Sequence, residues 1–219
     1  MKHYICLLIL ISLIVHITSC ASVRYEKYPD SGYAVASWYG TEFHGKPTSS
    51  GEIFNMYAMT CAHRSYPFGT KLVITNISTN KKAYCIVNDR GPFVEGRDID
   101  LSYAVAKEIG LIQDGVGKVR IDYSGRDDSY IREVKDVARE GPFTLQIGSF
   151  IEISNAIRLK KALEMKYNKV YITEAEIEGK NFYRVRIGKF SSRKNIYSLA
   201  NTLADEGYPV LITGYEEKI

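Results

Sequence analysis

Two neighbouring stretches decide the fold of the first half of the chain: VNDRGPF at residues 87–93 and GRDIDLS at residues 96–102. The first ends an alternating, strand-like segment, 83–87, in a turn that contains Gly and Pro. The second leads into a short helical segment, 103–109, which we expect Asp100 to cap.

Further strand-like segments lie on both sides of these stretches. Residues 33–39, 71–75 and 119–123 alternate between apolar and polar side chains, and turns rich in Gly, Pro, Asn and Ser separate them. Many short strands with one helix favour a small closed barrel over residues 33–123, because closure removes exposed sheet edges.

The last third of the chain alternates between strands and helices. We expect the order βαββαβ, with strands at 143–150, 170–175, 182–190 and 209–213 and helices at 154–166 and 192–206. QIGSF at 146–150 is echoed by RIGKF at 186–190, which indicates two related halves of one ferredoxin-like domain over residues 141–217. Residues 124–140 are dense in charge and predict a solvated linker.

The N-terminus has the pattern of an export signal followed by a lipid anchor. Its apolar run, 5–15, is shorter than the ~20 residues that cross a bilayer and has the size of a signal-peptide core. ITSC at 17–20 resembles a bacterial lipobox, which predicts a signal peptide at 1–19, lipidation of Cys20 and a tether at 20–32. The alternative is an ordinary secretory signal with a chance cysteine.

Composition limits the partners. The chain has 29 Lys and Arg against 25 Asp and Glu, a formal net charge of +4, which is too mild to indicate a nucleic-acid partner. Ala21 and Ser22 stand where lipoproteins retained in the inner membrane often carry Asp, so the outer membrane is favoured. We therefore expect a lipid-anchored envelope protein that faces the periplasm.

The barrel region also carries four more specific runs: ASWYG at 36–40, FHGKPTSSGE at 43–52, TCAHR at 60–64 and PFGT at 67–70. With NDRGPF and GRDIDLS they resemble the six-stranded double-psi β-barrel of the rare lipoprotein A family, the septal-ring lytic transglycosylases. The βαββαβ segment resembles a SPOR domain, a module that binds peptidoglycan glycan stripped of its stem peptides. Lipobox, barrel and SPOR domain follow one another as in that family.

The resemblance implies an activity. The family cuts MurNAc-GlcNAc bonds endolytically in naked glycan strands and leaves 1,6-anhydro ends, in a process that serves daughter-cell separation with division proteins as partners. No cofactor is implied, and His44 and His63 stand alone without the spacing of a metal site. Two alternatives are an expansin-like binder that leaves the glycan intact and a hydrolase that uses water on the same bond.

Three residues carry the chemistry that the resemblance implies. Asp89 is expected to act as acid and then base, Glu52 as the second carboxylate, and His63 as a partner that orients or tunes the site. The residues alone leave simpler interpretations open. Asp89 can be a turn residue that bonds its own backbone, Glu52 a solvated side chain, and His63 a buried structural histidine.

The SPOR-like domain has a candidate glycan surface. Gln146, Arg184 and Arg186 are expected to share the open face of the sheet, with Ser149 beside them. Such a face can hydrogen-bond sugar hydroxyls and the lactyl carboxylate of muramic acid. A merely solvated basic face is the alternative. An RNA-recognition domain shares this topology, but its aromatic signature is missing.

Two cysteines and two aromatic residues remain open. Cys61 and Cys85 lie in strand-like segments, and export permits a disulfide between them, although two buried thiols fit the sequence equally. Trp38 and Tyr39 either stack on sugar rings or fill the core at the end of a strand.

Overall fold

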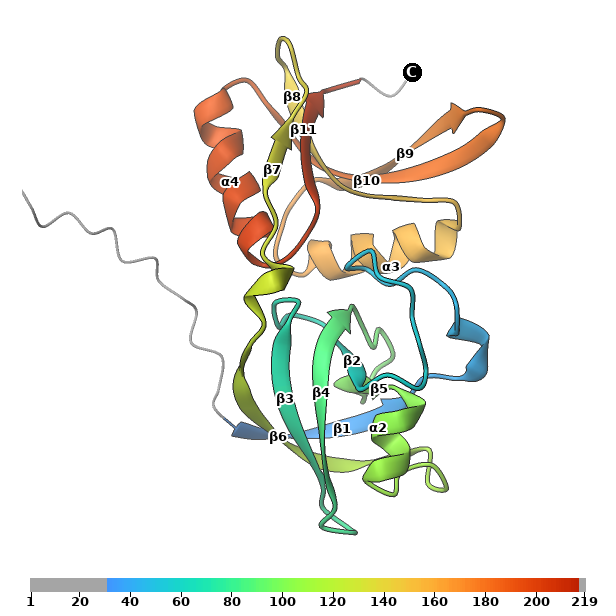
Figure 1. The fold of residues 1–219 in the computed structure, drawn as a ribbon. Helices are drawn as coiled ribbons and strands as arrows, with labels where there is room; N and C mark the ends of the chain where they lie inside the picture. Colours follow the sequence, from blue (N-terminus) through green and yellow to red (C-terminus); the bar gives the residue numbers. More distant parts are fainter. Residues whose placement is uncertain (1–30, 217–219) are drawn as a thin grey trace, which may run out of the picture.

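The computed structural model describes residues 31–216, which form two domains packed against each other (Figure 1). The signal peptide expected at 1–19, the lipid anchor at Cys20 and most of the tether expected at 20–32 lie outside the described residues. No helix among residues 31–216 is long and apolar enough to cross a membrane.

The first domain is a closed barrel, as predicted. Its strands are β1 (Ser31–Trp38), β2 (Thr60–His63), β3 (Thr70–Asn76), β4 (Lys82–Asp89), β5 (Ile99–Leu101) and β6 (Val116–Arg126). They close in the order β1-β5-β2-β4-β3-β6, with β1 parallel to β5, β2 parallel to β4 and the other pairs antiparallel. The prediction of a six-stranded double-psi barrel is confirmed.

Alternation along the strands fills the barrel. Leu72 and Ile74 on β3 and Val87 on β4 point inward and are fully buried. Tyr84 on β4 points to the other face and is exposed. A short 3-10 turn, η1 (Thr41–Phe43), follows β1 and begins the long loop toward β2. These strands and loops bring the ends of β1 and β4 to the same end of the barrel as the loop that contains Glu52.

The helix α2 (Tyr103–Glu108) is capped differently from the prediction. The Ser102 hydroxyl accepts from the Val105 backbone N–H at 3.2 Å, so Ser102 rather than Asp100 is the N-cap. Asp100 lies two residues before this N-cap, on β5, where its carboxylate accepts from the Ser37 hydroxyl.

The second domain has the predicted βαββαβ order. Its elements are β8 (Phe143–Phe150), α3 (Ile153–Glu164), β9 (Val170–Ile177), β10 (Lys180–Phe190), α4 (Arg193–Asp205) and β11 (Val210–Gly214). Both helices pack against the sheet, and α3 lies between the sheet and the barrel (Figure 1). Leu145, Ile147 and Val185 turn inward and are buried, whereas Gln146 is on the open face.

The predicted linker differs from the structure, because much of it is ordered. Residues 124–140 include the end of β6, the 3-10 turn η2 (Asp128–Tyr130) and a strand, β7 (Val134–Asp136). β7 pairs in parallel with β11, which makes the sheet five-stranded in the order β7-β11-β8-β10-β9. Lys135 on β7 is exposed, whereas Asp136 pairs with Arg193 and accepts from the Tyr197 hydroxyl of α4. The charge density of the sequence does not reveal this strand, because it forms through pairing with a distant partner.

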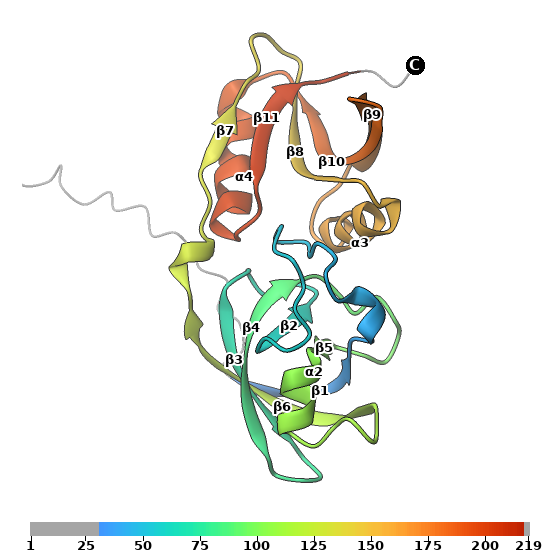
Figure 2. The ribbon, with the colours of Figure 1, turned by 45° about the vertical axis from the view of Figure 1, so that its right-hand side comes forward.

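A close contact joins the domains beside η2 (Figure 2). The Phe68 N–H donates to the Glu206 carbonyl at 2.9 Å, and the rings of Phe68 and Tyr208 lie 5.0 Å apart. Gly207 follows α4 with φ +94° and lies against Phe68, since a Cβ at this position would be 2.9 Å from the Phe68 Cβ. Glycine thus provides both the turn and the space. Most buried apolar residues of the two domains form one continuous core, and a smaller separate cluster contains Tyr39, Phe54, Met56 and Ala62.

Candidate functional site

Asp89 ends β4 and is buried at the domain interface, with an exposed fraction of 3%. One carboxylate oxygen accepts from the backbone N–H groups of Ser49 and Arg90, at 2.8 and 2.7 Å. The other accepts from the Tyr39 hydroxyl at 3.2 Å and from Arg158 of α3 at 3.0 Å. Four hydrogen-bond donors therefore surround this one carboxylate.

Glu52 lies in the loop of residues 48–52, and two hydrogen bonds join this loop to the end of β4 that contains Asp89. Asn88, next to Asp89 on β4, donates to the Glu52 carboxylate at 2.7 Å. In return, Ser49 of the Glu52 loop donates its N–H to Asp89. Burial, together with a hydrogen bond to Glu52, raises the pKa of Tyr130, so this phenol stays protonated. The structure therefore brings the two predicted carboxylates into one hydrogen-bonded arrangement.

His63 is held in its own turn. Its Nδ1 accepts from the backbone N–H groups of Ser65 and Tyr66, at 3.2 and 3.1 Å. Burial, followed by the charge of Arg90, lowers the pKa of His63 to about 3, so the imidazole is neutral at physiological pH. Its link to Asp89 is indirect. Arg90, whose N–H bonds Asp89, donates from its guanidinium to the carbonyls of His63 and Tyr66.

A cavity of about 430 Å³ opens beside Asp89, and both domains line it. Its walls include Trp38, Tyr39, Phe43, Arg90, Asp100 and Arg158. Trp38 is only half-buried and faces the cavity, where it can reach a ligand. Tyr39 is buried, and its hydroxyl contacts Asp89 instead. Burial, then the charge of Asp89, raises the pKa of Tyr39 well above its ordinary value, so this hydroxyl remains a donor.

Asp100 lines the same cavity, as does Glu42. It accepts from the Ser37 hydroxyl, and Arg97 lies 3.8 Å away. Burial raises the pKa of Asp100 because the charged form is poorly solvated there. Asp89 thus lies behind the cavity wall among four donors, whereas Asp100 lines the cavity and is largely desolvated.

The four predicted residues of the SPOR face are brought together in two cross-strand pairs. A β-bulge in β8 places Gln146 opposite Arg186 and Ser149 opposite Arg184. Arg184 and Gln146 are half-buried and Ser149 is exposed. Arg186 differs from the expectation of an accessible cation, because its side chain is 1% exposed and pairs with Glu216 at 3.2 Å.

Cys61 on β2 and Cys85 on β4 form a disulfide, with Cα atoms 5.9 Å apart. Both side chains are buried inside the barrel. The bond fastens the parallel pair β2 and β4, and Asp89 lies four residues further along β4.

Residues 31–216 contain no group of three or more His, Cys, Asp and Glu side chains that could hold a metal ion. The Nδ1 atom of His44 accepts from the Met56 N–H at 3.2 Å, which fixes the loop before Glu52.

Several site residues were missed from the sequence. The Tyr39 hydroxyl, Asp100 and Tyr130 all contact or neighbour the two carboxylates. The sequence indicates Tyr39 only as a stacking or core aromatic and Asp100 only as a helix cap, and it does not single out Tyr130. Arg158 is 69 residues from Asp89 in the chain and on another domain. No local pattern signals such a contact, whereas Asp100, inside the GRDIDLS run, could have been included on that ground.

Fold and site together define a class of protein: a double-psi barrel with a C-terminal SPOR domain and paired carboxylates where the two domains meet. The Lytic transglycolase family matches residues 32–121 and the SPOR domain family matches residues 140–213. The chain belongs to the rare lipoprotein A family.

Curated relatives resemble both domains. The endolytic peptidoglycan transglycosylase RlpA of Vibrio cholerae is 35% identical over 173 residues, covering 79% of this chain and 65% of that protein. RlpA of Helicobacter pylori strain J99 is 34% identical over 196 residues, covering 84% and 57%. The chain thus spans between half and two thirds of the length of these relatives. Among solved structures, an expansin of Clavibacter michiganensis aligns with 10% identity and a TM-score of 0.36, over 74% of this chain and 81% of that one.

Proposed function

We propose that the chain is an endolytic peptidoglycan transglycosylase that acts on naked glycan strands during daughter-cell separation, anchored through Cys20 to the outer membrane. The observation that carries the proposal is the buried Asp89, joined to Glu52 through Asn88 and Ser49 beside an open cavity. The named activity of the relatives supports the same reaction class.

The proposed reaction uses no water. The 6-hydroxyl of muramic acid closes onto C1 as the bond to the next sugar breaks. Asp89 gives a proton to the leaving oxygen and then takes one from the 6-hydroxyl, and Glu52 offsets the positive charge that develops on the sugar ring. The backbone donors of Ser49 and Arg90 stabilise Asp89 as it becomes ionised.

His63 has a positioning role in this proposal. Its turn presents two carbonyl oxygens to the Arg90 guanidinium, and Arg90 in turn holds Asp89 through its backbone N–H. On the other domain, Gln146, Ser149 and Arg184 contact the glycan, and Arg186 joins them when released from Glu216.

Mass spectrometry of products from purified naked glycan tests the function. We expect 1,6-anhydro ends from the wild type and a loss of cleavage of roughly 100-fold or more in Asp89→Asn, because a general acid-base group is removed. Asp114→Asn, in an exposed loop, is the matched control and should cleave normally.

Other products would overturn the proposal. New reducing ends would indicate a hydrolase, and intact glycan would indicate a wall-binding protein of the expansin kind. Full cleavage by Asp89→Asn would reject the assignment of Asp89.

A further inference from the structure

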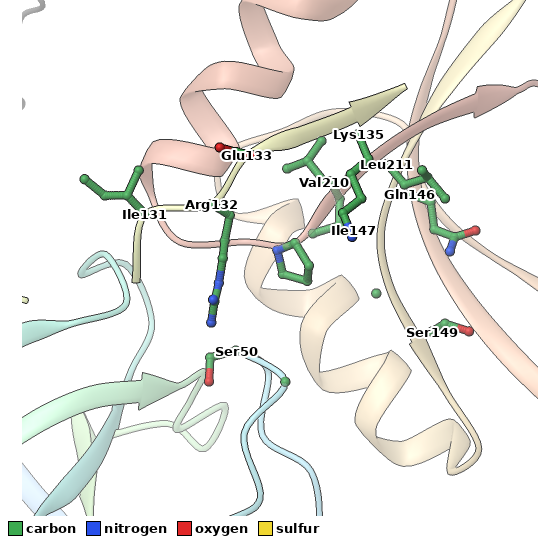
Figure 3. A pocket seen from close by; sticks show the side chains of 13 residues that line it. Ser50, Ile131, Arg132, Glu133, Lys135, Gln146, Ile147, Ser149, Val210 and Leu211 are labelled. Atoms are coloured by element: carbon green, nitrogen blue, oxygen red, sulfur yellow. The ribbon is translucent and has the colours of Figure 1, made fainter. Parts of the chain in front are cut away.

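A second cavity, of about 660 Å³, lies between the two domains under the linker (Figure 3). Its polar walls include Ser50 and Gly51 of the barrel loop, Arg132 and Lys135 of the linker, and Gln146 and Ser149 of β8, and residues 209–211 at the start of β11 line it as well. We name these residues the linker groove. Two of the predicted SPOR-face residues therefore share a cavity with the loop that carries Glu52.

The strand β7 extends the SPOR face toward the barrel. Lys135 pairs with Leu211, which pairs with Gln146, so these residues form one row across the open face of the sheet. β7 precedes the part of the chain that matches the SPOR family, residues 140–213. The row thus continues a recognisable SPOR surface onto a strand that the domain family does not include.

The linker supplies positive charge to this surface. Arg132 and Lys135 are exposed, and Figure 3 shows both side chains extending toward the barrel loop, Arg132 toward Ser50. Glu133 also borders the cavity, with its side chain on the other side of the linker backbone from Arg132 (Figure 3). Two cations beside hydrogen-bonding Gln146 and Ser149 suit a polar ligand that carries spaced carboxylates.

We propose that the linker groove is a glycan subsite that binds the free lactyl carboxylates of peptide-free muramic acid and directs the glycan strand to the Glu52 loop. The inference rests on the proposed substrate but not on cleavage. Glycan with stem peptides attached has no free lactyl carboxylate, so these cations give a physical basis for preferring naked strands. The barrel loop then forms the far wall of the binding groove.

Binding to cleavage-deficient Glu52→Gln chains tests this subsite, since glutamine keeps an acceptor for Asn88. In that background, Arg132→Ala with Lys135→Ala is compared with Lys161→Ala with Lys194→Ala, an exposed pair on the helices α3 and α4 that does not line the groove. The probes are naked glycan strands and the same strands with their lactyl carboxyl groups amidated. Fluorescence anisotropy gives the Kd.

We expect the groove pair to weaken binding of charged glycan about 10-fold and to leave binding of amidated glycan unchanged. The control pair should change neither. Unchanged binding of charged glycan, or an equal loss for both glycans, would overturn the subsite. If the groove pair weakens binding but the wild type leaves glycan uncut, the subsite stands and the proposed reaction fails.

A separate observation concerns Arg158 of α3. Its guanidinium donates to Asp89 at 3.0 Å and to Asn155 at 3.2 Å, and it lies 5.3 Å from the centre of the Phe43 ring. Arg158 and Ser154 line the cavity beside Asp89. The Arg158 side chain is 20% exposed, against 5% for Asp89, so it covers the solvent side of this carboxylate.

The ion pair between Arg158 and Asp89 must break before Asp89 can act as the general acid. A general acid needs a proton and contact with the glycosidic oxygen, and Arg158 lines the cavity and donates to one carboxylate oxygen of Asp89, which lies behind it. A second carboxylate that enters the cavity can take the guanidinium away from Asp89, because one charge-assisted pair replaces another.

We infer that Arg158 is a positioning residue that leaves Asp89 for the lactyl carboxylate of the muramic acid being cut. The arginine thereby couples arrival of a naked sugar to release of the acid. The SPOR domain contributes to the active site itself and not only to binding at a distance.

Cleavage of charged and amidated naked glycan by the full chain tests this role. The wild type should cut charged glycan at least 10-fold faster than amidated glycan, which cannot draw Arg158 away. In Arg158→Ala the ratio should fall to about one, through slower cutting of charged glycan at low concentration and faster cutting of amidated glycan. Arg158→Lys should keep part of the preference.

Lys161→Ala, an exposed cation on the same helix, is the matched control and should keep the wild-type ratio. A ratio in Arg158→Ala equal to that of the wild type would reject the positioning role. Equal loss on both substrates would show that Arg158 acts only in holding the domains together.

Discussion

At the scale of single residues, His63 is kept neutral by its surroundings. Its Nδ1 accepts two backbone N–H groups, and burial lowers the pKa of His63 to about 3, from an ordinary value near 6.5. Between these two pH values the unfolded chain binds a proton at this position and the folded chain does not. Folding stability must therefore fall as the pH is lowered through this window.

The His63→Asn variant makes this effect measurable. Asparagine offers an acceptor near the position of Nδ1 but does not titrate. From pH 6.5 downward, the free energy of unfolding of the wild type should fall by up to about 1.4 kcal/mol per pH unit more steeply than that of His63→Asn. Urea denaturation at several pH values gives both curves. Parallel curves over this range would contradict a neutral His63.

The sequence predicted the two carboxylates of the site but not the residues that contact them. Asp89 and Glu52 lie in sequence runs that contain glycine turns, and such runs indicate side chains that project from loops. Tyr39 and Arg158 reach Asp89 from 50 and 69 residues away. Contacts across such distances depend on how strands and domains pack, which local patterns do not encode.

At the scale of elements, helix and strand types followed from periodicity, while β7 did not. The helices α3 and α4 bury a regular apolar face, including Leu159 and Leu203, which produces a clear 3.6-residue pattern. β7 has three residues, too few for a period of two to be visible, and its partner β11 is far along the chain. Its strand conformation comes from tertiary pairing.

The disulfide between β2 and β4 gives a prediction at this scale. Its cysteines are 24 residues apart, and closing a loop of this size lowers the entropy of the unfolded chain enough to stabilise the fold by about 3 kcal/mol. Reduction should therefore lower the free energy of unfolding by about this amount in guanidinium denaturation. The variant with both Cys61→Ala and Cys85→Ala should not respond to reductant, and a response of equal size would assign the effect to another site.

At the scale of the whole molecule, the arrangement of the two domains was not predictable from the chain. Composition indicated a solvated linker, because charged residues dominate 124–140. In the structure Arg132 donates its backbone N–H to the Ala204 carbonyl, and Arg90 donates to the Tyr208 hydroxyl at 2.6 Å. The Arg90 guanidinium also stacks 3.7 Å from the centre of the Phe68 ring. The bond from Arg90 to Tyr208 needs both domains in place before it has any stabilising effect, and the bond from Arg132 to Ala204 needs the linker docked on α4.

The strand β7 has a further consequence for the proposed reaction. A loose tether would let the SPOR sheet hold a strand at one point while the barrel cut it anywhere within reach. β7 instead fixes the distance between the open sheet face and Asp89. A glycan gripped by the sheet is then cut at a set number of sugars from the grip. The fragments should cluster around one length, which is a property of the linker rather than of the catalytic residues.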